Sequence, residues 1–398
     1  MDRRWNAALV REVFRHMEAK TTDLAPDVMR HPVSLYRDPE HATKERDALF
    51  RSLPLAVAHA TELLRPGDFR AVDAAGVPIL VVRQGDGSVK AFVNVCRHRG
   101  ARLECEARGN RRGFDCSFHG WSYDLDGRLG AINFPDGFPG IDASERSLVE
   151  LPAEERHGFV WVVPNRRGGI DVATFLGDEL DRELSDWKLD RAVAERFAEF
   201  ETRSNWKLVM DGFLEDYHLP ILHRRTVGPY FRRNLHLFRD YERHGRLVAV
   251  RAKIREAETL PPEDVDLRRH ALFIYVLVPN SVLIWQIDHF QLWTIYPHPK
   301  EVDRCRTSVR FLIPSAEQID RERAIWDKNW TIITDTVKEE DWPNAEGIQA
   351  GLDTQETFVF GRNEPALQHF HRSLARELAL RPEPEPAYFR AASSACRE

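Results

Sequence analysis

Two short segments of the chain each combine one cysteine with one histidine. Cys96 and His98 lie two positions apart, and further along Cys116 and His119 lie three positions apart. Cysteine thiolate and histidine imidazole together form a ligand set for a transition metal. Four such side chains on two neighbouring loops therefore predict a metal centre and not a set of unrelated groups.

Two kinds of metal centre use two cysteines and two histidines. One is a structural zinc site, in which both cysteines usually come from a single loop. The other is a Rieske [2Fe–2S] cluster, in which two cysteines bind one iron and two histidines bind the other. Here each loop supplies one cysteine and one histidine, which favours the cluster over zinc. Such a cluster transfers single electrons, so we expect an electron acceptor elsewhere in the chain.

A second group of candidate ligands lies within residues 205–223. Asp211, Glu215 and His218 recur at intervals of four and three, which places them on one face of an expected helix, and His223 follows. Two imidazoles and one carboxylate on one side of an iron leave positions open for O₂ and substrate. The same polar face could instead be an ordinary solvated helix surface. Spacing alone does not choose the third, acidic ligand.

The elements that position these residues change in character near residue 165. Before it, short apolar runs alternate with turn signals such as Gly85-Asp86-Gly87, which is typical of β-hairpins. Both Cys/His pairs follow a strand, so we expect them on loops at hairpin ends. After residue 165, we expect one helix over 205–218, a long helix over 315–341, three antiparallel strands within 270–299 and a fourth strand over 306–314.

Large aromatic residues in and near these strands are candidates for lining a substrate pocket. They equally fit the core of a sheet. A pocket of aromatic side chains favours an apolar or aromatic substrate, although it could also enclose a methylated ammonium group. The candidates are Phe213, Trp285, Phe290 and Trp293.

The overall composition is that of an ordinary folded protein. The chain has 398 residues, of which 42% are hydrophobic and 30% charged, and it is long enough for two domains. The net charge of -6 argues against general binding to nucleic acid or membrane surfaces. The sequence contains no run of about 18 apolar residues, so we expect no membrane-spanning helix. The N-terminal segment has no apolar signal core, so we expect a cytoplasmic protein.

Together the two motif regions resemble the catalytic α subunits of Rieske non-heme iron oxygenases. The runs C-R-H-R-G at 96–100 and C-S-F-H-G-W at 116–121 look like the cluster loops of that family, and N-W-K…D…L-E-D-Y-H…H over 205–223 looks like its iron helix. The resemblance covers nearly the whole chain. It implies an α+β fold, in which a small antiparallel β Rieske domain is inserted in a larger, helix-grip-like catalytic domain with an antiparallel sheet.

The resemblance, together with the change from short strands to helices and longer strands near residue 165, implies three segments. Residues 1–45 would be an N-terminal helical segment that packs on the catalytic domain. Residues 46–165 would form the Rieske domain, and residues 166–398 the catalytic domain with its mononuclear iron.

The resemblance also implies roles for the candidate ligands. Cys96 and Cys116 would bind one cluster iron, and His98 and His119 would bind the other. His218 and His223 would bind a mononuclear Fe(II) together with an acidic residue much further along the chain. In that region Asp341 is the best match to the family pattern, and Glu340 is the fallback.

Glu215 matches the carboxylate that joins the two redox sites of this family across a subunit boundary. It would bind His218 of its own chain and the partner subunit's His119. With Asp211 it would form a catalytic polar stripe that faces another subunit, so the resemblance implies a homotrimer. Many members have Asp where Glu215 stands. A Glu at this position is similar to the branch of the family that contains the carnitine-type monooxygenases. The residue therefore weakens the expectation of ring dihydroxylation.

The implied function is that of a terminal oxygenase, an oxidoreductase of the mono- or dioxygenase class. A reductase fed by NAD(P)H, with or without a ferredoxin between them, would supply electrons. The enzyme would use O₂ to hydroxylate or dihydroxylate a small, apolar or aromatic substrate. Two alternatives stay open: N- or O-demethylation of a methylated compound such as a quaternary ammonium compound, and electron transfer by a Rieske carrier without oxygenase activity.

Overall fold

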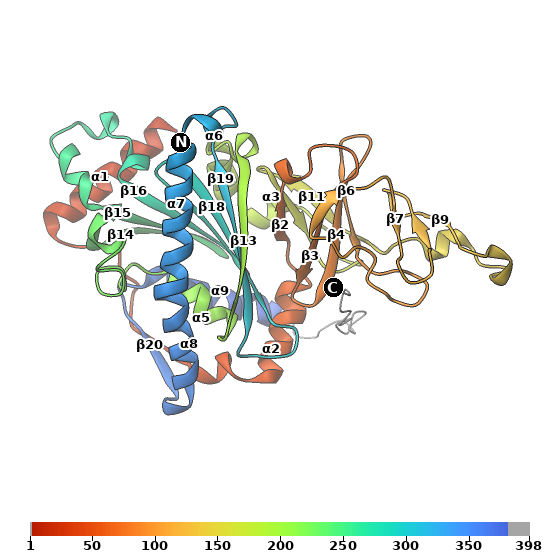
Figure 1. Ribbon diagram of the computed structural model, residues 1–398. Coiled ribbons are helices and arrows are strands. Elements are labelled where there is room, and N and C mark those ends of the chain that lie inside the picture. The colour runs from red at the N-terminus through yellow and green to blue at the C-terminus, as the bar shows by residue number, and fades with distance from the viewer. Residues whose placement is uncertain (1, 381–398) are drawn as a thin grey trace. The chain divides into compact units, whose positions relative to one another are not determined.

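The computed structural model describes residues 2–380 of the chain (Figure 1). Within them the chain forms two compact units. The N-terminal segment up to Glu45 joins the segment from Leu176 onward in the large unit, and Arg46–Phe175 form the small unit. Among the described residues, no helix has both the length and the apolar character needed to cross a bilayer.

The small unit is built from short antiparallel strands. Its largest sheet has the order β10-β5-β4-β3-β6, and the predicted hairpin at Gly85–Gly87 is confirmed as the connection between β4 and β5. Two three-stranded sheets, β11-β12-β2 and β7-β8-β9, complete the unit. The bounds are β2 Leu55–His59, β3 Asp68–Ala74, β4 Val77–Arg83, β5 Val89–Val93, β6 Arg108–Asn110, β7 Phe114–Asp115, β8 Ser122–Tyr123, β9 Leu129–Ala131, β10 Glu150–Leu151, β11 Ala153–Arg156 and β12 Phe159–Val162.

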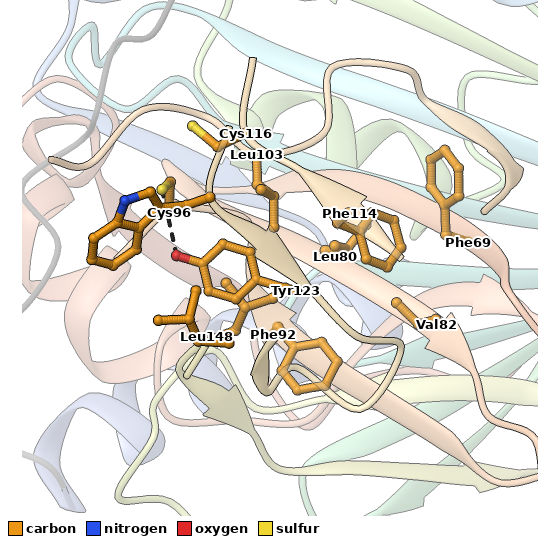
Figure 2. Close-up of a cluster of buried hydrophobic side chains, with 12 residues drawn as sticks. Phe69, Leu80, Val82, Phe92, Cys96, Leu103, Phe114, Cys116, Tyr123 and Leu148 are labelled. Carbon is orange, nitrogen blue, oxygen red and sulfur yellow. Dashed lines mark hydrogen bonds between the residues drawn. The ribbon is translucent and has the colours of Figure 1, made fainter. Parts of the chain in front are cut away.

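Between these strands lies an apolar core (Figure 2). Phe69, Phe92 and Phe114 are at most 2% exposed, as is Trp121. Inward-facing aromatic and aliphatic residues on paired strands bury a continuous apolar surface, which is what holds short strands together. Cys96 and Cys116 belong to the same cluster of buried residues, so the loops that carry them rest directly on this core.

The large unit is organised around a seven-stranded antiparallel sheet with the order β13-β19-β18-β17-β16-β15-β14. Its four strands β16 to β19 confirm the four strands predicted from the sequence. The bounds are β13 Val193–Thr202, β14 Phe231–Tyr241, β15 His244–Arg251, β16 Ala271–Leu277, β17 Ser281–Gln286, β18 His289–Pro297 and β19 Cys305–Ile313; a separate pair joins β1 Met29–Pro32 to β20 Thr357–Phe360.

Helices and aromatic side chains pack against this sheet. Trp5 of α1 lies against Phe273 of β16, with 6.2 Å between ring centroids, and Phe213 of α5 lies against Trp293 of β18 at 5.2 Å. The helices are α1 Arg3–Ala19, α2 Pro39–Glu45, α4 Asp178–Asp186, α5 Trp206–Phe213, α6 Gln318–Arg321, α7 Arg323–Thr336, α8 Trp342–Gly351 and α9 Pro365–Leu380, and α3 Val172–Leu176 lies at the boundary between the units.

The helix predicted over 205–218 is shorter than expected. It ends at Phe213, and the chain continues in turns through His218. The carboxylate of Glu215 accepts a hydrogen bond from the backbone N–H of His218 at 3.0 Å. This local side-chain bond gives the backbone an alternative to the helix. Tyr217, which lies beyond the end of the helix, is 62% exposed.

The long helix predicted over 315–341 is also interrupted. Glu322, with φ −119° and ψ 20°, separates α6 from α7. A π-helical turn, Val337–Asp341, then joins α7 to α8. Such turns add one residue to the helical repeat and are frequent at functional sites. Here the turn ends at Asp341, one of the predicted metal ligands.

Candidate active site with two metal centres

The two loops that carry the Cys/His pairs have the same backbone geometry. In the first loop, the amide of Cys96 donates to the carbonyl five residues further on at 2.8 Å, and Gly100 donates to the carbonyl of Cys96 at 3.0 Å. The second loop repeats both bonds from Cys116 and Gly120, at 2.8 and 2.9 Å. Both glycines have a positive φ, +83° and +70°, which other residues adopt only with strain. Each turn therefore presents its cysteine at the same position, and the histidine lies one residue further along in the second loop.

The structure brings the four predicted cluster residues together. The rings of His98 and His119 are 4.7 Å apart between centroids, and Cys96 and Cys116 are 2% and 3% exposed. Burial raises the pKa of the Cys96 thiol, and the neighbouring Cys116 adds to this. Nδ1 of His98 is buried without a hydrogen-bond partner among the described residues. Buried thiols beside an unsatisfied imidazole nitrogen fit the donor set of a Rieske cluster.

Tyr123 is a further contact of this site that the sequence analysis missed. Its hydroxyl lies 3.4 Å from Sγ of Cys96 and accepts a hydrogen bond from the backbone N–H of Arg97 at 2.9 Å (Figure 2). A tyrosine four residues after His119, at the second position of β8, carries no distinctive signal in a single sequence. Its hydrogen bond reaches a ligand sulfur, where such bonds tune the reduction potential of a cluster.

The second predicted site is assembled in the large unit. Nε2 of His218 and Nε2 of His223 lie 4.0 and 3.3 Å from one carboxylate oxygen of Asp341. One potential ligand atom from each of these three residues lies within 4.8 Å of the other two. Two imidazoles and one carboxylate in this arrangement match the donor set that holds non-heme Fe(II).

Two other carboxylates hold the outer nitrogens of the same histidines. Nδ1 of His218 contacts Glu215, and Nδ1 of His223 contacts Glu340. A carboxylate that accepts from Nδ1–H fixes the tautomer and leaves the Nε2 lone pair for a metal. Glu340, the fallback third ligand, is thus placed behind His223 and not beside Nε2. Burial opposes protonation of His223, but Asp341 and Glu340 together raise the pKa of its imidazole, so the site attracts a cation.

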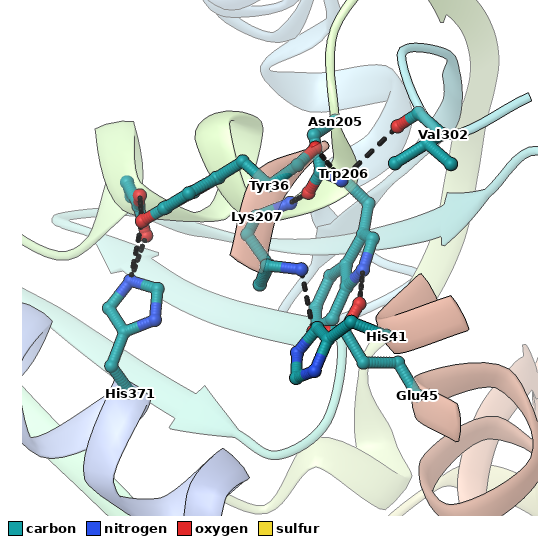
Figure 3. Close-up of polar contacts among 9 residues, drawn as sticks. Tyr36, His41, Glu45, Asn205, Trp206, Lys207, Val302 and His371 are labelled. Carbon is teal, nitrogen blue, oxygen red and sulfur yellow. Dashed lines mark hydrogen bonds and ion pairs between the residues drawn. The ribbon is translucent and has the colours of Figure 1, made fainter. Parts of the chain in front are cut away.

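Asp211 does not join this group of ligands. Its carboxylate accepts a hydrogen bond from the hydroxyl of Tyr36 at 2.7 Å and lies 2.8 Å from Nε2 of His371 (Figure 3). One turn earlier in α5, the ammonium of Lys207 is 2.6 Å from the carboxylate of Glu45. These contacts fix α5, which leads into the His218 turn. Sequence analysis missed Tyr36, Glu45 and His371, because these residues come from distant segments and match no local pattern.

A cavity of about 990 Å³ opens onto His218, His223 and Asp341. Phe213 and Trp293 line it, as predicted, but Trp285 and Phe290 do not. Those two rings pack against Trp187, with 5.3 and 5.4 Å between centroids, on the opposite face of the sheet. The reason is strand alternation, since neighbouring residues of a strand point to opposite faces.

Comparisons with known proteins agree with this geometry. Residues 54–141 match the Rieske [2Fe-2S] domain, and residues 182–380 match the catalytic domain of the ring hydroxylating alpha subunit. The chain is 27% identical to choline monooxygenase of Spinacia oleracea over 88% of this chain and 79% of that protein.

Two solved structures share the fold at low sequence identity. The quaternary ammonium Rieske monooxygenase CntA in complex with L-carnitine has a TM-score of 0.74 at 20% identity, covering 88% of this chain and 96% of that chain. Naphthalene 1,2-dioxygenase from Rhodococcus sp. has a TM-score of 0.72 at 18% identity, covering 95% of this chain and 99% of that chain. With both family matches in chain order and both donor sets assembled, the chain belongs to the Rieske oxygenases, as a catalytic α subunit.

Proposed function

We propose that this oxygenase hydroxylates or dihydroxylates a neutral, apolar or aromatic substrate. When bound, the Rieske cluster supplies single electrons and the mononuclear iron supplies O₂ activation. The residues of the chain then have three tasks: to hold these groups, to orient the substrate and to keep the reaction away from bulk water. The cavity beside His218, His223 and Asp341 is the observation that carries the proposal.

The charges of this cavity are confined to the metal end. All charged lining residues belong to the segment 211–224, apart from Asp341 and Glu364. Apart from Gln286 and Gln291, the wall formed by the sheet carries aliphatic and aromatic side chains, as does most of the wall formed by α7 and α8. A charged substrate would lose hydration in such a cavity without gaining a partner, whereas an apolar substrate gains from the transfer. The apolar lining of the two walls includes Ala249, Leu272, Ile274, Ile284, Ile332, Ile333 and Val337.

Three aromatic residues that line the cavity pack against one another and leave no space for an ammonium group between them. Phe213, Trp293 and Trp342 are 5.2, 6.2 and 6.3 Å from one another between ring centroids. These are the distances of rings in direct contact. A methylated ammonium held by cation–π contacts needs space between the rings. The three rings instead form one continuous apolar surface, which favours an aromatic substrate.

We assign the site residues accordingly. Cys96, Cys116, His98 and His119 hold the cluster; His218, His223 and Asp341 hold the iron. Glu215 orients His218 through Nδ1, and we propose that it also meets the partner subunit's His119 in a homotrimer. Asp211 is a positioning residue, because it acts through Tyr36 and His371.

The source of the electrons is part of the same proposal. We propose that a reductase that uses NAD(P)H, with or without a ferredoxin, reduces the cluster in the cytoplasm.

Demethylation of a quaternary ammonium compound is the second candidate. It is favoured by the similarity of the chain to a choline monooxygenase and to the carnitine monooxygenase oxygenase subunit of Escherichia coli, which is 27% identical over 87% of this chain. The exposed Arg224 is the only arginine among the residues that line the cavity, and no lysine lines it. A carboxylate such as that of carnitine therefore has one solvated partner only.

A single-turnover experiment separates the two candidates. The holoprotein is reduced anaerobically, mixed with ¹⁸O₂ and offered naphthalene, indole, L-carnitine or choline in turn. We expect ¹⁸O-labelled hydroxylated products from an aromatic compound, detected by mass spectrometry. Labelled formaldehyde, trapped as it forms, together with the demethylated amine from L-carnitine or choline and without aromatic products, would instead establish the second candidate. Reoxidation of the cluster without any labelled product from these compounds would contradict both.

A further inference from the structure

A row of hydrogen-bonding side chains crosses β17 and β18 on the cavity side of the sheet. Nε1 of Trp293 donates to Oε1 of Gln291 at 2.9 Å. Nε2 of Gln291 in turn donates to Oε1 of Gln286 at 2.7 Å. All three residues line the cavity, and they sit in a wall that is otherwise apolar. We call these three residues the amide row.

Chemistry fixes the direction of the amide row. The indole nitrogen of Trp293 can only donate, so the atom of Gln291 that faces it must be the carbonyl oxygen. The other end of that amide is then its NH₂ group, which requires an acceptor. Gln286 must therefore turn its oxygen toward Gln291. Its own NH₂ group points away from the row.

His289 locks the same direction from the other side. Its Nδ1 lies 2.6 Å from the carboxylate of Asp288, which places the proton on Nδ1, and its Nε2 lies 3.1 Å from Nε2 of Gln291. Burial lowers the pKa of His289, so the ring is neutral and Nε2 is an acceptor. Gln291 thus donates both hydrogens, one to His289 and one to Gln286. Gln291, Trp293 and His289 are at most 3% exposed, so solvent does not compete for these bonds.

The NH₂ group of Gln286 has no acceptor among the described residues. The only hydrogen bond of its side chain there is the one that its oxygen accepts from Gln291. On the sheet its partners are Leu272 of β16 and His289 of β18. Ile274 and Ile284 line the same wall. Gln286 is only half-buried, so water in the cavity can accept from this NH₂ group. A substrate that displaces this water must supply an acceptor of its own or leave the donor unpaired.

We infer that Gln286 determines specificity by donating a hydrogen bond to a neutral acceptor, such as a ketone or nitro oxygen, on an otherwise apolar substrate. The inference rests on the proposed function, because it concerns the same cavity. It narrows the substrate from apolar compounds in general to those with one uncharged acceptor. The bond holds the acceptor end at the sheet wall, which leaves the rest of the molecule free to extend through the cavity.

The test compares 1-indanone with indane, which differ by a carbonyl oxygen. Binding to the holoprotein is measured by calorimetry for the natural chain and for Gln286→Leu. A cavity without a donor would favour indane, because the ketone loses hydration on entering. We expect the natural chain to bind 1-indanone about ten-fold more tightly than indane, which is the effect of one hydrogen bond. In Gln286→Leu the preference should reverse in favour of indane, through loss of ketone affinity alone.

Gln355→Leu is the matched control, since Gln355 also lines the cavity but lies outside the amide row. It should keep the ten-fold preference. Gln291→Met should weaken the preference, because it frees Gln286 to rotate. An unchanged preference in Gln286→Leu, or tighter binding of indane by the natural chain, would overturn the inference while leaving an apolar substrate in place. Turnover of L-carnitine with no binding of either bicyclic compound would overturn the proposed function as well.

Discussion

The two metal sites rest on different kinds of support. The cluster loops lie on an apolar core of aromatic and aliphatic side chains (Figure 2). The helix α5, which leads into the iron ligands, is held by buried polar and charged groups (Figure 3). Apolar packing does not depend on protonation, whereas an ion pair does. The two sites should therefore fail under different conditions.

The polar support of α5 is extensive. The side chains of Lys207 and Glu45 are each 2% exposed, and the same carboxylate accepts a hydrogen bond from Nε1 of Trp206 at 3.0 Å. The amide of Asn205 donates to the backbone carbonyls of Tyr36 and, at 3.1 Å, of Val302. Each group is paired, so burial of the charges is compensated. Removal of one partner leaves an uncompensated charge.

The largest effects should come from loss of a metal ligand. Cys116→Ser removes a cluster thiolate, so we expect loss of the cluster iron and sulfide, with no turnover. His223→Ala should instead lose the mononuclear iron and keep the cluster, since the two sites lie in separate units. Iron and sulfide analysis with EPR of the reduced protein measures both outcomes.

Cys305→Ser is the control for the cysteine change. Cys305 is buried and free like Cys116, but it lies on β19, outside both sites. It should keep full iron and sulfide content. Loss of the cluster from both cysteine variants would show that the effect came from misfolding and not from a missing ligand.

The next largest effect should follow from breaking the buried ion pair. Lys207→Met leaves the carboxylate of Glu45 buried without its cation, which should lower the free energy of unfolding of the large unit by about 3–5 kcal/mol. Hydrogen exchange of the α5 amides would report it. Lys90→Met breaks an exposed pair with Glu150, whose side chains are 35% and 57% exposed, and should change stability by less than about 1 kcal/mol.

Acid should weaken α5 before it weakens the apolar core. Burial alone would raise the pKa of Glu45, but Lys207 and His41 lower it from 4.5 to about 2. Because the folded pKa lies below the unfolded one, the stabilisation is complete above pH 4.5 and is lost as pH falls toward 2. We expect a loss of about 3 kcal/mol across that window.

Hydrogen exchange at several pH values compares the two supports directly. The α5 amides should lose protection below pH 4.5, and those of β4 and β5 should keep it longer. The double variant Glu45→Leu/Lys207→Met has no charge to titrate, so its α5 should lose this part of the pH dependence. Equal acid sensitivity of α5 in the double variant and the natural chain would contradict the assignment.

The two carboxylates behind the iron histidines offer a finer comparison. Glu215 and Glu340 each hold one Nδ1, but only Glu215 is proposed to meet the partner subunit's His119. Glu340→Gln should lower iron affinity by about 10–100-fold, and excess Fe(II) should restore turnover. Glu215→Gln should weaken iron binding to a similar extent, but its turnover should stay about 100-fold lower after excess Fe(II) has refilled the site. Rescue of both variants would show that Glu215 only positions His218.

The difference between the cluster loops and the iron site also explains how much of each could be predicted from the sequence. Each cluster loop carries its two ligands within four residues, and the hairpins around them follow from local turn signals, so the motif could be recognised directly. The choice between Asp341 and Glu340 could not be made, because it depends on a contact with a histidine more than a hundred positions earlier. Lys207, a charged residue of a helix whose polar face could have been solvated, is buried because its partner Glu45 comes from a remote segment.

The end of α5 and the alternation of the aromatic residues have similar causes. The hydrophobic period suggested a helix through His218, but the contact between Glu215 and the His218 backbone competes with it. Four aromatic residues were equally plausible for the pocket until the register of β17 and β18 assigned Trp285 and Phe290 to the far face. Strand periodicity is local information, but which face meets the cavity is decided by tertiary packing.

The smallest expected effects come from removing one tyrosine hydroxyl, first beside the cluster and then beside α5. The hydroxyl of Tyr123 accepts from the N–H of Arg97, so its own hydrogen is free to donate to Sγ of Cys96. A donor to a ligand sulfur stabilises the more negative, reduced cluster. Tyr123→Phe should therefore lower the reduction potential, by about 40 mV if the bond contributes about 1 kcal/mol.

Tyr36→Phe is the matching change in the other support. It removes the hydroxyl that donates to Asp211, so it should loosen the α5 amides in hydrogen exchange and leave the cluster potential unchanged. Protein-film voltammetry and hydrogen exchange on both variants give a crossed result if the two supports are independent. A potential shift in Tyr36→Phe, or an unshifted potential in Tyr123→Phe, would break the comparison, because a hydroxyl would then act on the cluster by some route other than its direct bond to the ligand sulfur.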